Sequence, residues 1–125
     1  MSIQIKRAYE KPEAGDGYRV LVDGLWPRGQ SKAKLKIDEW MKDIAPSGSL
    51  RKWYGHDPDK WREFRKKYRE ELTEPRRLEL LKQLVDRARK QKVTLVFGAQ
   101  AAEISNAAVL EEVIGSQLGR ARRAA

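Results

Sequence analysis

The beginning of the chain alternates short apolar stretches with polar, glycine-containing ones. Ile3 to Tyr9 alternates apolar and polar positions, which predicts a half-buried edge strand. A loop is expected over residues 10–17, and the apolar run Tyr18 to Val22 after it predicts a more buried strand that ends at Asp23. Leu25 to Ser31 contains a proline and a glycine and therefore predicts an ordered loop.

Apolar residues recur at the helical period in the next part of the chain. Over residues 37–46 this spacing predicts a helix that ends at Pro46. Ser47 is a suitable N-cap for a second, short helix, which Gly55 would end. Two short helices are therefore expected before the first long one.

Two longer helices with clear start signals follow. Asp57 before Pro58 begins one of them, because the carboxylate accepts unpaired backbone amides and proline is tolerated at the first helical position. Glu74 before Pro75 repeats the signal. Each helix carries one apolar stripe, so we expect the two to form a helical hairpin.

The end of the chain returns to a strand and then to a helix. Val93 to Phe97 is a continuous apolar run, which predicts a central strand covered on both faces. Gly98 to Ala102 is expected to be a loop, and a last helix should run from about Glu103 or Ser105 through Leu118.

The predicted order of elements indicates one α/β domain over residues 1–118, followed by a basic, frayed tail over residues 119–125. We expect a small, mainly parallel sheet with an edge strand and about five helices. Because the carboxyl ends of parallel strands open on one edge, the loops after Asp23 and Gly98 should meet there.

Composition narrows the classes of protein that remain. There is no cysteine and the net charge is +9, so we expect a reducing, cytoplasmic compartment and anionic partners. Charged residues early in the chain argue against a signal peptide, and no segment is apolar enough to predict membrane contact. With one histidine, the chain predicts no zinc site of the usual kinds and no cofactor site, although a carboxylate site for magnesium stays open.

The loop after the second strand is the strongest candidate site. Arg28 offers a planar fork of donors for an anion, Trp26 a stacking face, and Gly29 room for close backbone approach. The structural alternative is that Trp26 fills the core and Arg28 pairs with Asp23 or a helix carbonyl.

Three further residues have both a functional and a structural interpretation. Arg51 would join an anion pocket with the helix start at Ser47, or lie on a solvated face. Asp23 and His56 are the candidates for proton transfer, since acids at strand ends often face ligands and histidine titrates near neutrality. Alternatively, Asp23 caps a turn and His56 only packs beside Asp57, which caps a helix.

Several blocks of sequence resemble the YeaO-like family of bacterial proteins of unknown function. The blocks are Arg19–Gly29 (RVLVDGLWPRG), Ile37–Trp40 (IDEW), Lys42–Ser47 (KDIAPS) and Leu50–Pro58 (LRKWYGHDP). The resemblance covers nearly the whole chain and implies a compact α/β domain, while the family brings no established reaction with it.

The chain departs from the family pattern at polar positions. Similar proteins carry arginine where this chain has Gly24. They carry a Lys-Asp pair and a His-Asn pair where it has Gln100-Ala101 and Ile104-Ser105, and it keeps only Asn106 nearby. If those residues are catalytic in the family, the resemblance implies that this chain lacks the chemistry and keeps binding.

Three functions follow as hypotheses. The first is binding of a small anionic or nucleotide-like ligand where the loops after Asp23 and Gly98 meet, by Arg28, Arg51, Trp26, Gly29 and Asn106. The second is a nucleic-acid-associated or regulatory binding protein, with weak, nonspecific nucleic-acid binding by the arginine tail and by the helices between Asp57 and Lys92. Basic residues outnumber acidic ones in these helices, although their charges also alternate as on a solvated face. The third is a protein interaction module. Whether any turnover occurs is left open by the sequence.

Overall fold

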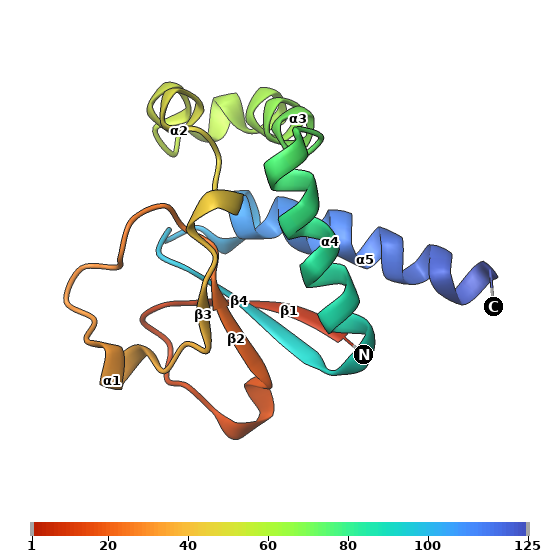
Figure 1. Cartoon of the computed structure of the whole chain (residues 1–125). Helices are drawn as coiled ribbons and strands as arrows, with labels where there is room; N and C mark the ends of the chain where they lie inside the picture. The colour runs from red at the N-terminus through yellow and green to blue at the C-terminus, as the bar shows by residue number, and fades with distance from the viewer. Residues whose placement is uncertain (1, 125) are drawn as a thin grey trace.

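A sheet of four parallel strands in the order β1-β4-β2-β3 lies at the centre of the computed structural model, which describes residues 2–124 (Figure 1). The strands are β1 (Ser2–Arg7), β2 (Tyr18–Leu21), β3 (Glu39–Trp40) and β4 (Lys92–Phe97). Leu95 of β4 aligns with Ile5 of β1 and with Val20 of β2. The predicted edge strand, buried strand and central strand are therefore confirmed.

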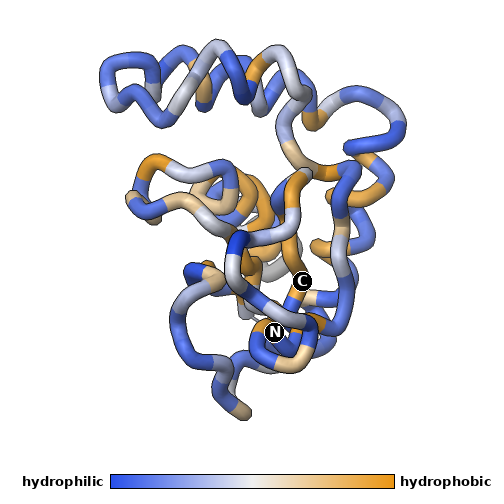
Figure 2. The backbone as a smooth tube through the Cα atoms, turned by 90° about the vertical axis from the view of Figure 1, so that its left-hand side faces the viewer, coloured by the Kyte–Doolittle hydropathy of each residue, from blue (hydrophilic) through white to orange (hydrophobic). Residues whose placement is uncertain are grey.

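Alternate residues of the strands build two hydrophobic clusters, one on each face of the sheet. On one face, Val20 and Leu95 are fully buried in the main core with residues of the long helices. On the other, Leu21 and Val96 form a smaller core with Leu35. Figure 2 shows apolar stretches gathered inside the fold and hydrophilic ones along its outer turns. Burial on both faces explains the continuous apolar runs in the sequence.

The helices are α1 (Lys32–Leu35), α2 (Gly48–Tyr54), α3 (Trp61–Glu71), α4 (Pro75–Lys90) and α5 (Asn106–Ala124). The predicted caps are confirmed, since the Ser47 hydroxyl accepts the amide of Leu50 and the Asp57 carboxylate accepts that of Asp59. The α5 helix continues past Leu118, where its end was expected; residue 125 lies outside the described part of the chain. Within residues 2–124, no helix has both the length and the apolar character needed to cross a bilayer.

The helix predicted over residues 37–46 is wrong. The segment forms the short strand β3 and a single 3-10 turn over Lys42–Ile44. The amides of Asp38 and Met41 donate to the carbonyls of Arg19 and Leu21, at 2.8 and 2.9 Å, so pairing with the edge of β2 replaces helical hydrogen bonds.

The predicted hairpin of the two long helices is also wrong. The α3 helix packs against α2 and α5, whereas α4 packs against α5 and β4. Phe64 of α3 stacks on Tyr54 of α2 with ring centroids 4.0 Å apart, and the α4 residues Leu81 and Leu84 are buried in the main core. The apolar face of each helix is buried as expected, but the two faces pack against other elements and not against each other.

A buried ionic network, which the sequence analysis did not predict, lies beside the smaller core. The carboxylate of Asp16 bonds to Lys6 Nζ at 3.1 Å and to an Arg19 guanidinium nitrogen at 2.7 Å. Arg19 also donates to the carbonyl of Leu35, and Thr94 donates to that of Asp16. The network ties the turn before β2 to strands β1 and β4.

Candidate functional site

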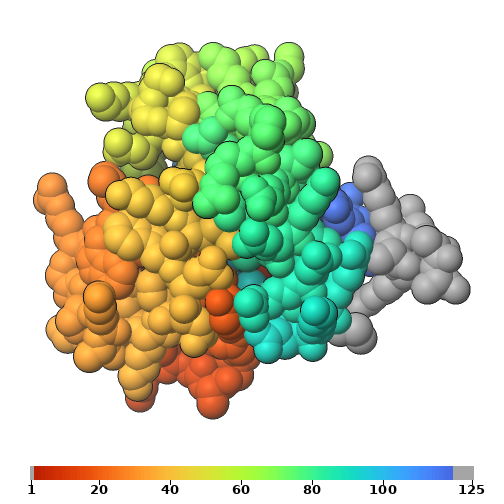
Figure 3. Space-filling model, viewed as in Figure 1, coloured from red at the N-terminus to blue at the C-terminus, as the bar shows by residue number. Residues whose placement is uncertain are grey.

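A cleft of about 630 Å³ opens at the carboxyl ends of β2 and β4. Its walls come from residues 23–28, residues 45–46, the end of α2 with the turn after it, and residues 98–99 and 105–106. In the space-filling view the surface is notched between α2 (yellow) and the loop after β2 (orange) (Figure 3). The loops after Asp23 and Gly98 therefore meet at one edge of the sheet, as parallel strands require.

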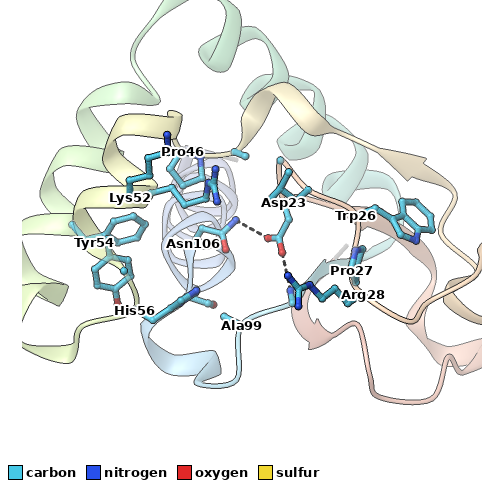
Figure 4. A pocket seen from close by; sticks show the side chains of 18 residues that line it. Asp23, Trp26, Pro27, Arg28, Pro46, Lys52, Tyr54, His56, Ala99 and Asn106 are labelled. Atoms are coloured by element: carbon cyan, nitrogen blue, oxygen red, sulfur yellow. Dashed lines mark hydrogen bonds between the residues drawn. The ribbon is translucent and has the colours of Figure 1, made fainter.

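Asp23 points into this cleft from the end of β2 (Figure 4). Its Oδ2 accepts the amide of Gly98 at 2.8 Å, and its Oδ1 accepts Nδ2 of Asn106 at 3.2 Å. The same Asn106 amide group donates to the carbonyl of Val22, and Trp40 Nε1 donates to the Asp23 carbonyl at 2.7 Å. Both the backbone and the carboxylate of Asp23 are thus held in place.

Burial raises the pKa of Asp23 above its ordinary value, although the amide of Gly98 and the side chain of Asn106 act in the opposite direction. The positive charge of His56 also acts to lower it. The carboxylate is therefore in surroundings that disfavour its charge more than the two hydrogen bonds favour it.

Three basic side chains, Arg28, Arg51 and Lys52, line the same cleft and are exposed. None of the three forms an ion pair with another side chain in the described part of the protein. Figure 4 shows Lys52 and Arg28 on opposite sides of the space in front of Asn106. The cleft thus carries uncompensated positive charge at its rim.

The anion site expected at the start of α2 is already occupied by a protein carboxylate. Glu71 accepts the Ser47 amide at 2.8 Å and the Ser47 hydroxyl at 2.5 Å. The predicted combination of Arg28, Arg51 and this helix start therefore does not form. The side of α2, rather than its beginning, faces the cleft.

Trp26 lines the cleft and also packs in the fold. Its ring points away from Asp23 and packs on the ring of Trp40 at 5.4 Å, and its Nε1 donates to the Gln30 carbonyl (Figure 4). It belongs to the smaller core. Gly29 has a φ of 75° in the turn that ends at Gln30 and does not line the cleft, so this turn, rather than ligand approach, explains the glycine.

His56 lies at the mouth of the cleft in a left-handed backbone conformation, with φ of 58°. It is exposed, and its ring centroid is 6.2 Å from that of Tyr54. Asp57 caps the following turn, as expected, and so does not orient the imidazole. No hydrogen bond joins His56 to Asp23 among the described residues.

The floor of the cleft is aromatic, which the sequence analysis missed. Tyr54 stacks on Phe64, and its hydroxyl donates to the Ile104 carbonyl at 2.7 Å. Burial raises the pKa of Tyr54. Both residues were expected only as core positions, because a helical stripe does not reveal which of its members borders a cleft.

The departures from the family pattern fall partly inside the cleft. Gly24 and Ser105 line it, whereas Gln100, Ala101 and Ile104 do not. Ser105 donates to the Ala102 carbonyl and accepts the Ala108 amide, so its hydroxyl serves the start of α5. Among the described residues, no group of three or more histidine or acidic side chains is arranged to hold a metal ion.

Sequence comparison places the chain among proteins without an assigned activity. It is 42% identical over 116 residues to the uncharacterized protein YeaO of Escherichia coli, covering 93% of this chain and 99% of that protein. It is 38% identical over 115 residues to the uncharacterized protein Rv3073c of Mycobacterium tuberculosis, covering 92% and 95%. No solved structure matches it. A family model described as "Inactive DUF488-N3 subclade" matches residues 2–125, and the chain therefore belongs to this subclade of the DUF488 family.

Proposed function

We propose that the protein binds a small anionic ligand in the cleft at the carboxyl edge of its sheet. The observation that carries this proposal is that three cations, Arg28, Arg51 and Lys52, surround one concave site and have no acidic partner among the described side chains. A volume of about 630 Å³ lies within the range of small-molecule sites. A guanidinium group binds phosphate or carboxylate through paired hydrogen bonds.

The residues around the cleft support binding of the ligand without its chemical conversion. The hydroxyl of Ser105 and the carboxylate of Asp57 are engaged in capping, so Ser105 is not set up as a nucleophile and Asp57 is not set up as its base. The family model that matches residues 2–125 is described as inactive, which agrees with binding in the absence of turnover. Tyr54 and Phe64 supply an apolar surface for the uncharged part of the ligand.

The experiment is a thermal-shift titration with inorganic phosphate and with nucleoside monophosphates. We expect these anions to raise the melting temperature of the wild type, and Arg28→Ala to respond much less. Arg62→Ala is the matched control, because Arg62 is exposed and lies on α3 outside the cleft. Equal responses from the two variants, or no response from the wild type, would refute the proposal.

A further inference from the structure

Two acidic side chains beside the sheet, Asp16 and Asp23, have different hydrogen-bond and ion-pair partners. Asp16 is 3% exposed and meets two cations, Lys6 and Arg19. Asp23 is partly buried and meets only neutral donors, the amide of Gly98 and the side chain of Asn106. Removing a carboxylate from water is costly unless a cation compensates it, so Asp23 is the exception.

The hydrogen bonds of Asp23 leave room for a further partner. Each carboxylate oxygen has two acceptor positions, and each oxygen of Asp23 uses one of them. The side chain faces the cleft, where the remaining positions are open to a bound molecule (Figure 4). No cationic side chain among residues 2–119 lies within ion-pairing distance of it.

The position of Asp23 is fixed on several sides. Trp40 Nε1 donates to its carbonyl, and the amide of Gly98 and the side chain of Asn106 each donate to one oxygen of its carboxylate. The carboxylate therefore cannot turn far without giving up its bonds to Gly98 and Asn106. A cationic group on a ligand in the cleft can contact the Asp23 carboxylate while the bonds to Gly98 and Asn106 are kept.

We infer that the ligand is amphoteric, with an anionic group bound by the cations at the rim of the cleft and a protonated amine bound by the Asp23 carboxylate. This inference rests on the proposed function. It narrows the ligand class from anions in general to molecules that carry both charges within the length of the cleft. A compact polyanion is disfavoured, because its second negative charge would face Asp23.

Matched pairs of phosphate esters test the inference by isothermal titration calorimetry. Phosphoethanolamine is compared with ethyl phosphate, and aminobutyl phosphate with butyl phosphate, so that only the amine differs within a pair. In the wild type we expect at least one amino ester to bind about tenfold more tightly than its partner, equivalent to about 1.4 kcal/mol. In Asp23→Asn the two members of that pair should bind equally, whereas Arg28→Ala should weaken both and Arg62→Ala neither.

The outcomes separate this inference from the proposed function. If the alkyl phosphates bind and the amino esters bind no better in the wild type, the inference is overturned and the proposed function stands. If no phosphate ester binds, both are overturned. If butylamine alone binds as tightly as aminobutyl phosphate, the anionic group contributes nothing, and the proposed function fails together with the inference. The wild-type comparison decides the question even if Asp23→Asn is poorly folded.

Discussion

Asp23 makes the stability of the protein depend on pH in a specific direction. Burial raises the pKa of this carboxyl group in the folded state above the ordinary value of 3.8. At Asp23 the folded protein therefore binds a proton more tightly than the unfolded chain does. As the pH rises from the pKa of the unfolded state to that of the folded state, ionisation of Asp23 lowers the free energy of unfolding. Below pH 3.8 this cost is absent, and above the folded pKa it is complete.

The first prediction follows from this dependence of stability on the ionisation of Asp23. Asp23→Asn removes the ionisation, but its NH2 group replaces an oxygen that accepts a hydrogen bond from Gly98 or Asn106, a loss present at every pH. We therefore expect the melting temperature of the variant, relative to the wild type, to be higher at neutral pH than below about pH 4, where the wild-type carboxyl group is also neutral. Asp86→Asn, at an exposed position, is the control, and its difference from the wild type should change little between the two pH values. A relative melting temperature of Asp23→Asn that falls from acid to neutral pH would contradict the prediction.

Two nearby glycines offer a second test at the scale of single residues. Gly17 has φ of 67°, and a Cβ atom there would lie 2.3 Å from the carbonyl oxygen of Lys92. Gly17→Ala is therefore expected to lower the free energy of unfolding by about 2–4 kcal/mol. At Gly15 nothing lies within 4 Å of an added Cβ atom and φ is not positive, so Gly15→Ala should change stability by less than about 1 kcal/mol. Urea unfolding of the two variants measures the difference.

Single residues were predictable from sequence where a local rule governs them. Ser47 and Asp57 cap helices as expected, because capping involves residues only two or three positions apart. The occupation of the Ser47 helix start by Glu71 depends on how α3 packs, so no local pattern contains it. The same is true of Trp26, whose partner Trp40 is reached only through the pairing of β2 with β3.

Among the elements, the turn before β2 is held by the buried network around Asp16. Burial alone would raise the pKa of Asp16, but the Glu13 amide, Lys6 and Arg19 together lower it below its ordinary value. The unfolded chain then binds the proton more tightly than the folded protein. The Asp16 carboxylate therefore stabilises the protein fully above the pKa of the unfolded state, and this stabilisation is lost as the pH falls through the pKa of the folded state.

The third prediction concerns this network. Asp16→Asn leaves Lys6 and Arg19 buried without a counter-charge, and removal of one member of a buried pair costs roughly 3–5 kcal/mol. Asp86→Asn breaks an exposed pair with Arg89 and should cost less than about 1 kcal/mol. We expect the deficit of Asp16→Asn, measured by urea unfolding, to be largest at neutral pH and to narrow in acid. Equal losses in the two variants would contradict a structural role for the network.

Elements were predicted correctly where their own residues decide the outcome. The strands β2 and β4 are buried on both faces, so their apolar runs are unambiguous. Residues 37–46 mislead because Met41 and Ile44 enter the main core while Ile37 packs on the opposite face, which imitates the helical period. The segment is a strand because the edge of β2 offers it hydrogen bonds, and that edge exists only in the assembled sheet.

At the scale of the whole molecule, topology made the site predictable in outline. Parallel strands joined by helices end on one edge, so the sequence alone predicts that the loops carrying Asp23, Gly98 and Asn106 meet, and the three residues are joined by hydrogen bonds. The aromatic floor and the free cation Lys52 were missed. Both depend on how α2 packs against α3, where Tyr54 stacks on Phe64, and this packing is a tertiary contact that no local pattern contains.

The net charge is +9, but many of the basic side chains have an acidic partner. On α3 and α4 several basic residues bond to acidic neighbours: Arg65 and Arg69 to Glu112, Arg76 to Asp43 and Glu79, Arg77 to Glu74, and Arg89 to Asp86. These contacts support the solvated-face interpretation of the basic helices. Pairs of opposite charge present little net field to a polyanion.

The last prediction is that nucleic acid binds only weakly and with a shallow dependence on salt. Each phosphate of single-stranded DNA that a free cation neutralises adds about 0.7 to the magnitude of the slope of log K against log salt concentration. Among the described residues of α3 and α4, five arginines already have acidic partners, whereas six cations do not: Arg62, Lys66, Lys67, Lys82, Arg87 and Lys90. If only these six contact phosphate, we expect a slope of magnitude about 4 or less. Fluorescence anisotropy of labelled single-stranded DNA measures it, with Arg28→Ala and Arg62→Ala each reducing the slope by at most about one. A slope of about 6 or more would mean that the acidic partners give way to phosphate, and the basic helices would then be a nucleic-acid surface.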